Sequence, residues 1–330
     1  MKNAIKLPLT EPLYSTYHHQ GAATAVISDN PTLRNWYLTN AVSLSCELAF
    51  LFGRTTPLIN VENSSWLDCP YFRERWFDSK YILNCSDKVI KNLIDDGFYV
   101  AFGGVDDFFV KGKTWYKKRH FNHDGLICGY DKRKKTYDIY AYDINWIYRR
   151  FETPQKGFVA GLVEMSKHKY YEPICGIKPR DNIIDFEPEI SAKKIKEYLD
   201  SSFEKYPPKE DAKAFGNIVH DYMAKYIDMI LEEKIPYEKI DNRIFRMIFE
   251  HKKAMLERIS LTEKILSTKN NHISERYQNI VSSANSLRLL YASYCIKRKD
   301  SVLLSLREKL LKIKEEETKI LTEFLNETGL

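Results

Sequence analysis

The sequence lacks paired cysteines and long apolar runs, and its second half is nearly free of glycine. Its 6 cysteines form no C-x-x-C pair, so common zinc motifs and a disulfide framework are not expected. No apolar stretch approaches the roughly 18 residues that a membrane-spanning helix needs, and the first residues contain no apolar signal-peptide core. We therefore expect a cytoplasmic protein that needs no metal or other cofactor and does not enter a membrane.

The charge of the chain is nearly balanced. Its 330 residues include 51 Lys and Arg against 45 Asp and Glu, which gives a net charge of +6. This excess is small, and no recognition helix or other nucleic-acid motif accompanies it, so nucleic-acid binding is not expected. The hydrophobic content of 44% is typical of a folded globular protein.

The pattern of the sequence changes near residue 185. Residues 1–185 combine aromatic residues, glycines and short apolar runs, whereas residues 186–330 repeat apolar residues at helical spacing. We predict an α+β fold in which a domain with a largely antiparallel sheet (1–185) precedes an α-helical accessory domain (186–330). The predicted strands cover 98–103, 106–110, 124–130, 136–143 and 157–164, and the predicted helices cover 190–206, 211–233, 240–259, 273–294 and 303–324.

One predicted hairpin brings a histidine and an aspartate together. Residues 131–135 form a polar turn between two apolar runs, and a turn centred on Arg133 places His123 opposite Asp143. Side chains paired in this way have Cβ atoms about 5 Å apart. A histidine held by a carboxylate supplies the base and its orienting group in a nucleophilic triad. The alternative is a surface histidine beside an unrelated aspartate.

Several segments resemble the papain-like cysteine peptidases, in the branch of butirosin biosynthesis protein H and the double-glycine peptidases. That family's first motif is a Cys followed by small residues, Thr, Ala and an aliphatic residue, and its later motif is a His followed six positions on by Gly-Tyr. The matching segments here are Ala22–Val26, Leu44–Gly53, Val89–Phe102 and His123 with Gly129-Tyr130. The resemblance implies a papain-like domain with an N-terminal nucleophile helix, His123 as base and Asp143 as its orienter.

The cysteine that this resemblance requires is replaced by Ala22. We interpret the chain as an inactive Cys-to-Ala variant; the alternatives are a relative without activity or a nucleophile at another position. Ala23 is a second candidate for the replaced position, and Cys46 is the best remaining thiol, although its apolar surroundings favour an inert buried cysteine. Gln20 is a candidate oxyanion donor. The neighbouring His18 and His19 are interpreted as loop residues.

The resemblance also implies the reaction. Butirosin protein H and the amide synthase of closthioamide assembly transfer an acyl chain from a carrier-protein thioester to an amine. We therefore expect an amide-forming acyltransferase of nonribosomal-peptide-type natural-product biosynthesis, with an acyl or peptidyl carrier protein and a small amine as partners. The alternatives are a double-glycine-type cysteine peptidase, because water or an amine can resolve the same acyl-enzyme, and a binding protein without catalysis.

Basic residues lie on both sides of the histidine motif. Lys117, Lys118 and Arg119 precede His123, and Lys132 and Arg133 lie in the hairpin turn. Because carrier proteins are acidic, a basic rim near the site would attract one. The alternative is an ordinary solvated loop and turn.

Overall fold

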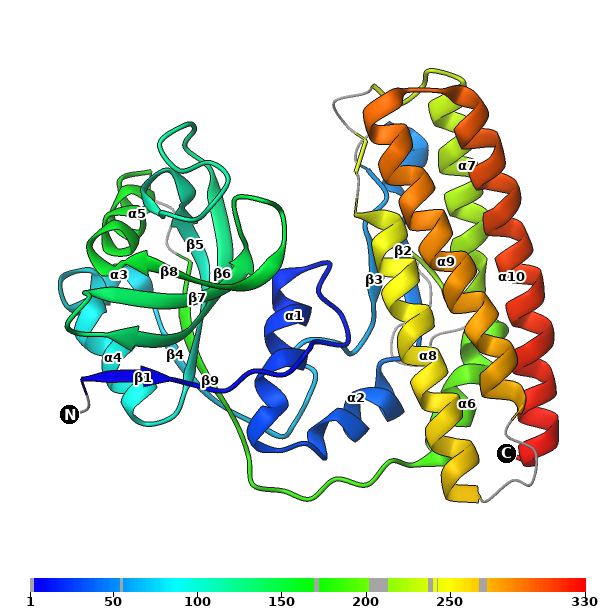
Figure 1. Cartoon of the computed structure of the whole chain (residues 1–330), viewed down its shortest axis with the longest axis horizontal. Helices are drawn as coiled ribbons and strands as arrows, with labels where there is room; N and C mark the ends of the chain where they lie inside the picture. The colour runs from blue at the N-terminus through cyan, green and yellow to red at the C-terminus, as the bar shows by residue number, and fades with distance from the viewer. Residues whose placement is uncertain are drawn as a thin grey trace. The chain divides into compact units, whose positions relative to one another are not determined.

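The computed structural model has two compact units (Figure 1). The first consists of Met1–Arg34 and Ser65–Ile183, and the second of Asn35–Ser64 and Ile184–Leu330. This division falls beside the expected boundary at residue 185, but it assigns residues 35–64 to the second unit. The structure describes residues 3–53, 56–168, 172–201, 213–236, 240–241, 243–266 and 272–330, without the side chains of 28 and 29.

The fold is mixed α+β, and every strand pair of the first unit's sheet is antiparallel. The strand order is β4-β9-β5-β6-β7-β8, and β1 pairs with the end of β6. The strands are β1 (Ala4–Lys6), β4 (Phe72–Phe77), β5 (Tyr99–Asp106), β6 (Asn122–Asp131), β7 (Thr136–Tyr142), β8 (Tyr148–Pro154) and β9 (Ile174–Pro179).

Two helices cover the apolar core of this sheet. Ile90 and Leu93 of α4 and Phe158 of α5 pack against Ile127 and Ile139 of the hairpin. Figure 1 shows α4 and α5 on the opposite side of the sheet from α1. The helical segments of this unit are α1 (His18–Ala25), η1 (Val26–Asp29), α3 (Ser79–Ile82), η3 (Leu83–Cys85), α4 (Ser86–Asp95), η4 (Asp107–Phe109) and α5 (Gln155–Lys167), and α2 (Leu33–Asn40) crosses into the second unit.

The predicted hairpin is confirmed, and two other predicted strands are wrong. Strands β6 and β7 flank the expected turn, and Ile127 faces Ile139 as predicted. The segment 157–164 lies in helix α5, because Phe158 and Leu162 are four residues apart and reach the same core. The segment 106–110 contains the short helix η4 instead of a strand.

The second unit is mainly helical. Its three-stranded sheet has the order β10-β2-β3, and the long helices α8, α9 and α10 confirm three predicted ones. The predicted helix 211–233 is wrong at its start, where Lys213–Phe215 forms a strand, and 202–212 lies outside the described residues. The elements are β2 (Leu44–Glu47), η2 (Leu48–Phe52), β3 (Ile59–Val61), α6 (Pro188–Leu199), β10 (Lys213–Phe215), η5 (Gly216–Ile218), α7 (Val219–Leu231), α8 (Ile244–Leu266), α9 (His272–Lys297) and α10 (Asp300–Thr328).

A buried polar network connects four of these helices. Lys252 of α8 and Glu317 of α10 form an ion pair of 2.6 Å, and both side chains are completely buried. The hydroxyl groups of Tyr198 in α6 and Tyr277 in α9 donate to the same carboxylate. Every oxygen of Glu317 therefore has a partner, which is the condition under which a buried charge is tolerated. In the described part of the chain, no helix is long and apolar enough to cross a membrane.

Candidate functional site

His123 lies at the start of β6, between a carboxylate and an ammonium group. Its Nδ1 is 3.2 Å from Oδ2 of Asp107 and 3.1 Å from Nζ of Lys113. Both partners are buried, and Lys113 Nζ is 3.8 Å from Asp107 Oδ1. Burial lowers the pKa of Lys113, against the raising effect of the Asp107 and Asp124 carboxylates. A carboxylate at Nδ1 is the arrangement that orients a histidine for work at Nε2.

The predicted hydrogen bond between His123 and Asp143 is not formed. The Asp143 carboxylate accepts the backbone N–H groups of Asn145 and Ile147 and pairs with Arg149. Burial opposes ionisation of Asp143, but these donors outweigh it and lower the pKa of the carboxyl. Asp143 therefore shapes the turn between β7 and β8, and Asp107 takes the place beside His123 that was predicted for it.

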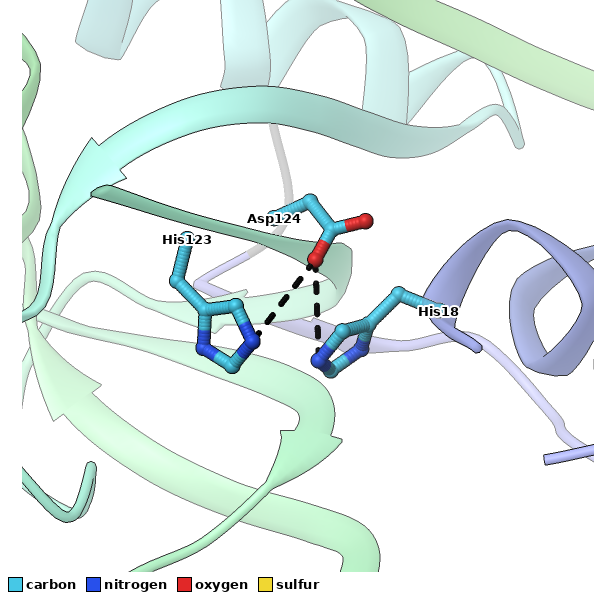
Figure 2. Close-up of side chains that lie close together, drawn as sticks. All are labelled: His18, His123 and Asp124. Carbon is cyan, nitrogen blue, oxygen red and sulfur yellow. Dashed lines mark ion pairs between the residues drawn. The ribbon is translucent and has the colours of Figure 1, made fainter. Parts of the chain in front are cut away.

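Helix α1 presents a histidine to His123 where a cysteine was expected. The helix begins at His18, after the extended residue Tyr17, so Ala22 lies inside the helix and not at its first position. The rings of His18 and His123 meet edge to face with centroids 4.8 Å apart, and Figure 2 shows both imidazoles facing Asp124. The His18 ring also packs against Tyr142 and Tyr148. The first turn of α1 thus places the His18 imidazole beside His123, four residues before Ala22.

A bulge in β5 brings Asp124 into this group. Phe102 pairs with Gly125 and Val105 with His123, so two residues of β5 face Asp124 alone. Such a bulge breaks the alternation of side chains along the strands and is common beside functional sites. Oδ1 of Asp124 lies 3.7 Å from Nε2 of His18 and 3.9 Å from Nε2 of His123.

Two of these groups, His18 and Asp124, line a cavity of about 240 Å³, and His123 lies next to both of them. Asp124 and Glu172 supply carboxylates, and Trp66 and Trp76 supply indole rings. The part of the chain that the structure describes places no Lys or Arg in its lining. The lining residues are His18, His19, Ala22, Trp66, Trp76, Ala101, Phe102, Gly103, Asp124, Gly125, Glu172, Pro173 and Cys175.

The ionisation of the cavity walls favours neutral imidazole and neutral thiol. Burial lowers the pKa of His19, although Asp124 and Asp68 act against it. Burial raises the pKa of the Cys175 thiol to about 12, and its Sγ contacts the Gly176 carbonyl oxygen at 3.7 Å. A thiol with so high a pKa has almost no thiolate at neutral pH and is a poor nucleophile.

Of the predicted nucleophile and oxyanion positions, Ala22 alone lines the cavity. Ala22 lines it, one helical turn beyond His18, but Gln20 and Ala23 are buried without lining it. Cys46 lies in strand β2 of the second unit, where burial raises the pKa of its thiol. The interpretation of Cys46 as a buried cysteine is confirmed.

The two predicted groups of basic residues lie at opposite ends of β6. Lys117, Lys118 and Arg119 are exposed on the loop that leads into His123. Lys132 and Arg133 lie in the turn beyond Asp131, about 30 Å along the strand from His123 at 3.3 Å per residue. They therefore do not form a single rim around the site.

Sequence reasoning missed the residues that complete the site. His18 is the first residue of a helix, not a loop residue, and Asp107 and Asp124 were not considered. The available signals were the adjacent His123-Asp124 pair and the position of His18 one turn before Ala22. No protein-family model matches the chain, and the search of curated proteins gave no match either.

Proposed function

We propose that this cavity is the active site of an acyltransferase of papain-like ancestry that joins a carrier-bound acyl group to an amine. His123 serves as the general base, and Asp107 serves as its orienting carboxylate. The observation that carries the proposal is the cavity lining, which combines two carboxylates and two indole rings beside the His123–Asp107 pair. This lining suits a substrate that enters as an ammonium ion and reacts as an amine.

The walls of the cavity favour a cation. Asp124 and Glu172 both face it, and the described residues provide Glu172 with no hydrogen-bond or ion-pair partner. The electron-rich faces of Trp66 and Trp76 attract ammonium groups by about 0.5–2 kcal/mol, depending on desolvation. The Nε1–H of Trp66 is buried without a partner among the described residues.

The chemistry proceeds without an acyl-enzyme, because Ala22 offers no nucleophile and the Cys175 thiol is protonated. The bound ammonium ion first releases one proton to water, and Nε2 of His123 then takes a second proton from the neutral amine while its nitrogen attacks the thioester carbonyl. The C–S bond then breaks, and His123 returns the proton to the departing sulfur. Asp107 stabilises the imidazolium that forms between these steps. The proposal therefore retains the acyl transfer to an amine that the sequence predicted, but it contains no covalent acyl-enzyme intermediate.

The carrier protein docks beside the first residues of β6. Lys118 and Arg119 are exposed there, and the turn after β7 exposes Ile144, Trp146 and Ile147. The Thr114 hydroxyl donates to the Asp143 carbonyl at 3.1 Å, which joins the basic loop to this apolar turn. A basic and apolar surface fits an acidic partner that also buries apolar side chains.

The test is amide formation from an acyl thioester and an amine, followed by mass spectrometry and by release of the free thiol. General-base catalysis contributes about 10²–10⁴-fold, so His123→Gln should lower the rate constant by that factor. Asp107→Asn should lower it as well, by orienting the wrong tautomer. His168→Gln is the matched control, since His168 is an exposed histidine 3.8 Å from a carboxylate at the end of α5.

Ala22→Cys separates this mechanism from the acyl-enzyme route. Under the proposal, the protein with Ala22 forms the amide. The Ala22→Cys variant also forms it and differs at most by a thioester adduct on the new cysteine. Activity of the variant alone would restore the Cys acyl-enzyme interpretation. Free acid at saturating amine would indicate a hydrolase, and amine binding without turnover of any thioester would indicate a binding protein.

A further inference from the structure

We infer that His18, His123 and Asp124 form a binding site for a divalent transition-metal ion such as Zn²⁺. The three side chains come from α1 and from the start of β6, and their ligand atoms all lie within 4.8 Å of one another. Figure 2 shows that the two rings and the carboxylate converge on one point. Two imidazoles and one carboxylate are a recurrent ligand set for zinc and for non-haem iron.

The distances are those of a site that closes slightly around an ion. Ligand distances of about 2.0–2.2 Å place neighbouring donor atoms of a tetrahedral zinc site about 3.3–3.6 Å apart. Oδ1 of Asp124 is 3.7 Å from His18 Nε2 and 3.9 Å from His123 Nε2. A contraction of about 0.5 Å is within reach of side-chain rotation, because the Asp124 side chain is 40% exposed.

The surroundings of His123 match those of a metal ligand. A metal-binding histidine usually donates its other ring N–H to a carboxylate, which fixes the tautomer. Asp107 holds this position at Nδ1 of His123, at 3.2 Å. His18 and Asp124 also line the cavity, so a fourth ligand position faces open space. Three protein ligands and one open position are typical of reactive zinc sites.

Lys113 competes for the same ring nitrogen. Its Nζ is 3.1 Å from His123 Nδ1. If Lys113 donates a hydrogen bond to Nδ1, then Nδ1 carries no hydrogen, and the hydrogen of the neutral ring is on Nε2. A protonated Nε2 cannot bind a metal, because its lone pair is used. The structure therefore predicts opposite effects for two neighbours: Lys113→Met should tighten metal binding, and Asp107→Asn should weaken it.

This inference goes beyond the proposed function, and it sets a limit on it. An ion bound at Nε2 of His123 occupies the lone pair that the proposed base uses. Bound metal and base catalysis at His123 therefore exclude each other, and the ion acts as an inhibitor of amide formation. Binding is measured on the protein without thioester or amine, so failure of the metal site leaves the acyltransferase proposal untouched.

The experiment titrates the full chain with Co²⁺ and Zn²⁺. Co²⁺ bound to histidine and carboxylate ligands absorbs visible light, and Zn²⁺ affinity follows from competition with a chromophoric chelator. We expect one strong site, and a loss of affinity of at least 10-fold in each of His18→Ala, His123→Ala and Asp124→Asn. The partly exposed Asp124 supplies a variant that keeps its fold, which the melting temperature of the metal-free protein verifies.

Two controls locate the site. His168→Ala should leave binding unchanged, because its neighbour Glu164 is the single carboxylate within ion-pair distance among the described residues. The second unit has another group of three potential ligands, His272, Glu323 and Glu327, but Arg276 already pairs with Glu323. Loss of the strong site in His272→Ala, or its retention in all three variants of the first group, would overturn the inference.

Discussion

Removal of the Lys252 ammonium group is expected to destabilise the second unit strongly. Lys252→Met keeps much of the side-chain volume but leaves the completely buried Glu317 carboxylate without its cation. Breaking one side of a buried ion pair costs about 3–5 kcal/mol, because the remaining charge stays desolvated. The free energy of unfolding of a domain is about 5–15 kcal/mol, so this substitution removes a large part of it.

Urea unfolding followed by circular dichroism at 222 nm measures this effect, because the long helices α8, α9 and α10 dominate that signal. The double variant Lys252→Met/Glu317→Leu removes both charges and should recover most of the loss, since an apolar pair of similar volume is often neutral. Lys314→Met is the control: its partner Asp221 is 44% exposed, and its loss should cost less than about 1 kcal/mol. A change within 1 kcal/mol for Lys252→Met, or a double variant weaker than the single one, would refute the reasoning.

Two further predictions concern the carrier surface and acid stability. In steady-state kinetics at low salt, Lys118→Glu/Arg119→Glu should raise KM for a carrier-bound thioester about 10-fold and leave KM for a small-molecule thioester unchanged. The control Lys132→Glu/Arg133→Glu, at the far end of β6, should change neither KM. Equal effects of the two double variants would contradict the proposed docking surface. Burial lowers the pKa of His220 to about 3 from an ordinary value near 6.5, so the unfolded chain binds this proton first. The contribution of neutral His220 to the free energy of unfolding is therefore fully present above pH 6.5, and it falls by about 1.4 kcal/mol per pH unit between pH 6.5 and 3. His220→Leu should flatten that slope in urea titrations at several pH values, and an unchanged slope would assign the acid sensitivity to other groups.

The hairpin could be predicted from sequence because its register depends on local turn chemistry and alternation. Ile127 faces Ile139 as a turn centred on Arg133 predicts, but the pairs nearest the turn, such as Asp131 with Thr136, are one residue out of that register, and an irregularity between Ile127 and Gly129 restores it. The same rule extended to Asp143 failed, because β7 ends at Tyr142 and the Asp143 carboxylate binds the backbone of its own turn. Local pattern therefore located the strands, but it could not choose the partner of His123 among several aspartates.

Other features depend on contacts that the sequence pattern does not contain. Asp107 reaches His123 only because η4 turns back after β5, and no spacing rule connects these positions. Lys252 and Glu317 stand on the apolar stripes of α8 and α10, where the helical repeat predicts buried residues, but the repeat does not show that the two charges meet as an ion pair. The segment 157–164 contains the short apolar runs of a strand, and helix packing on β5 overrides that preference.

The assignment of residues 35–64 to the second unit has a consequence for synthesis of the protein. Strand β2 pairs Ala214 with Cys46 and Phe215 with Ser45, although these residues are about 170 positions apart in the chain. At about 5–20 residues per second, a ribosome needs roughly 10–30 s to make the intervening segment. During that interval the edge of β2 that later binds β10 has no strand partner, and strands β4 to β9 of the first unit are synthesised. Neither unit is therefore a contiguous module that can be separated by a cut at residue 185.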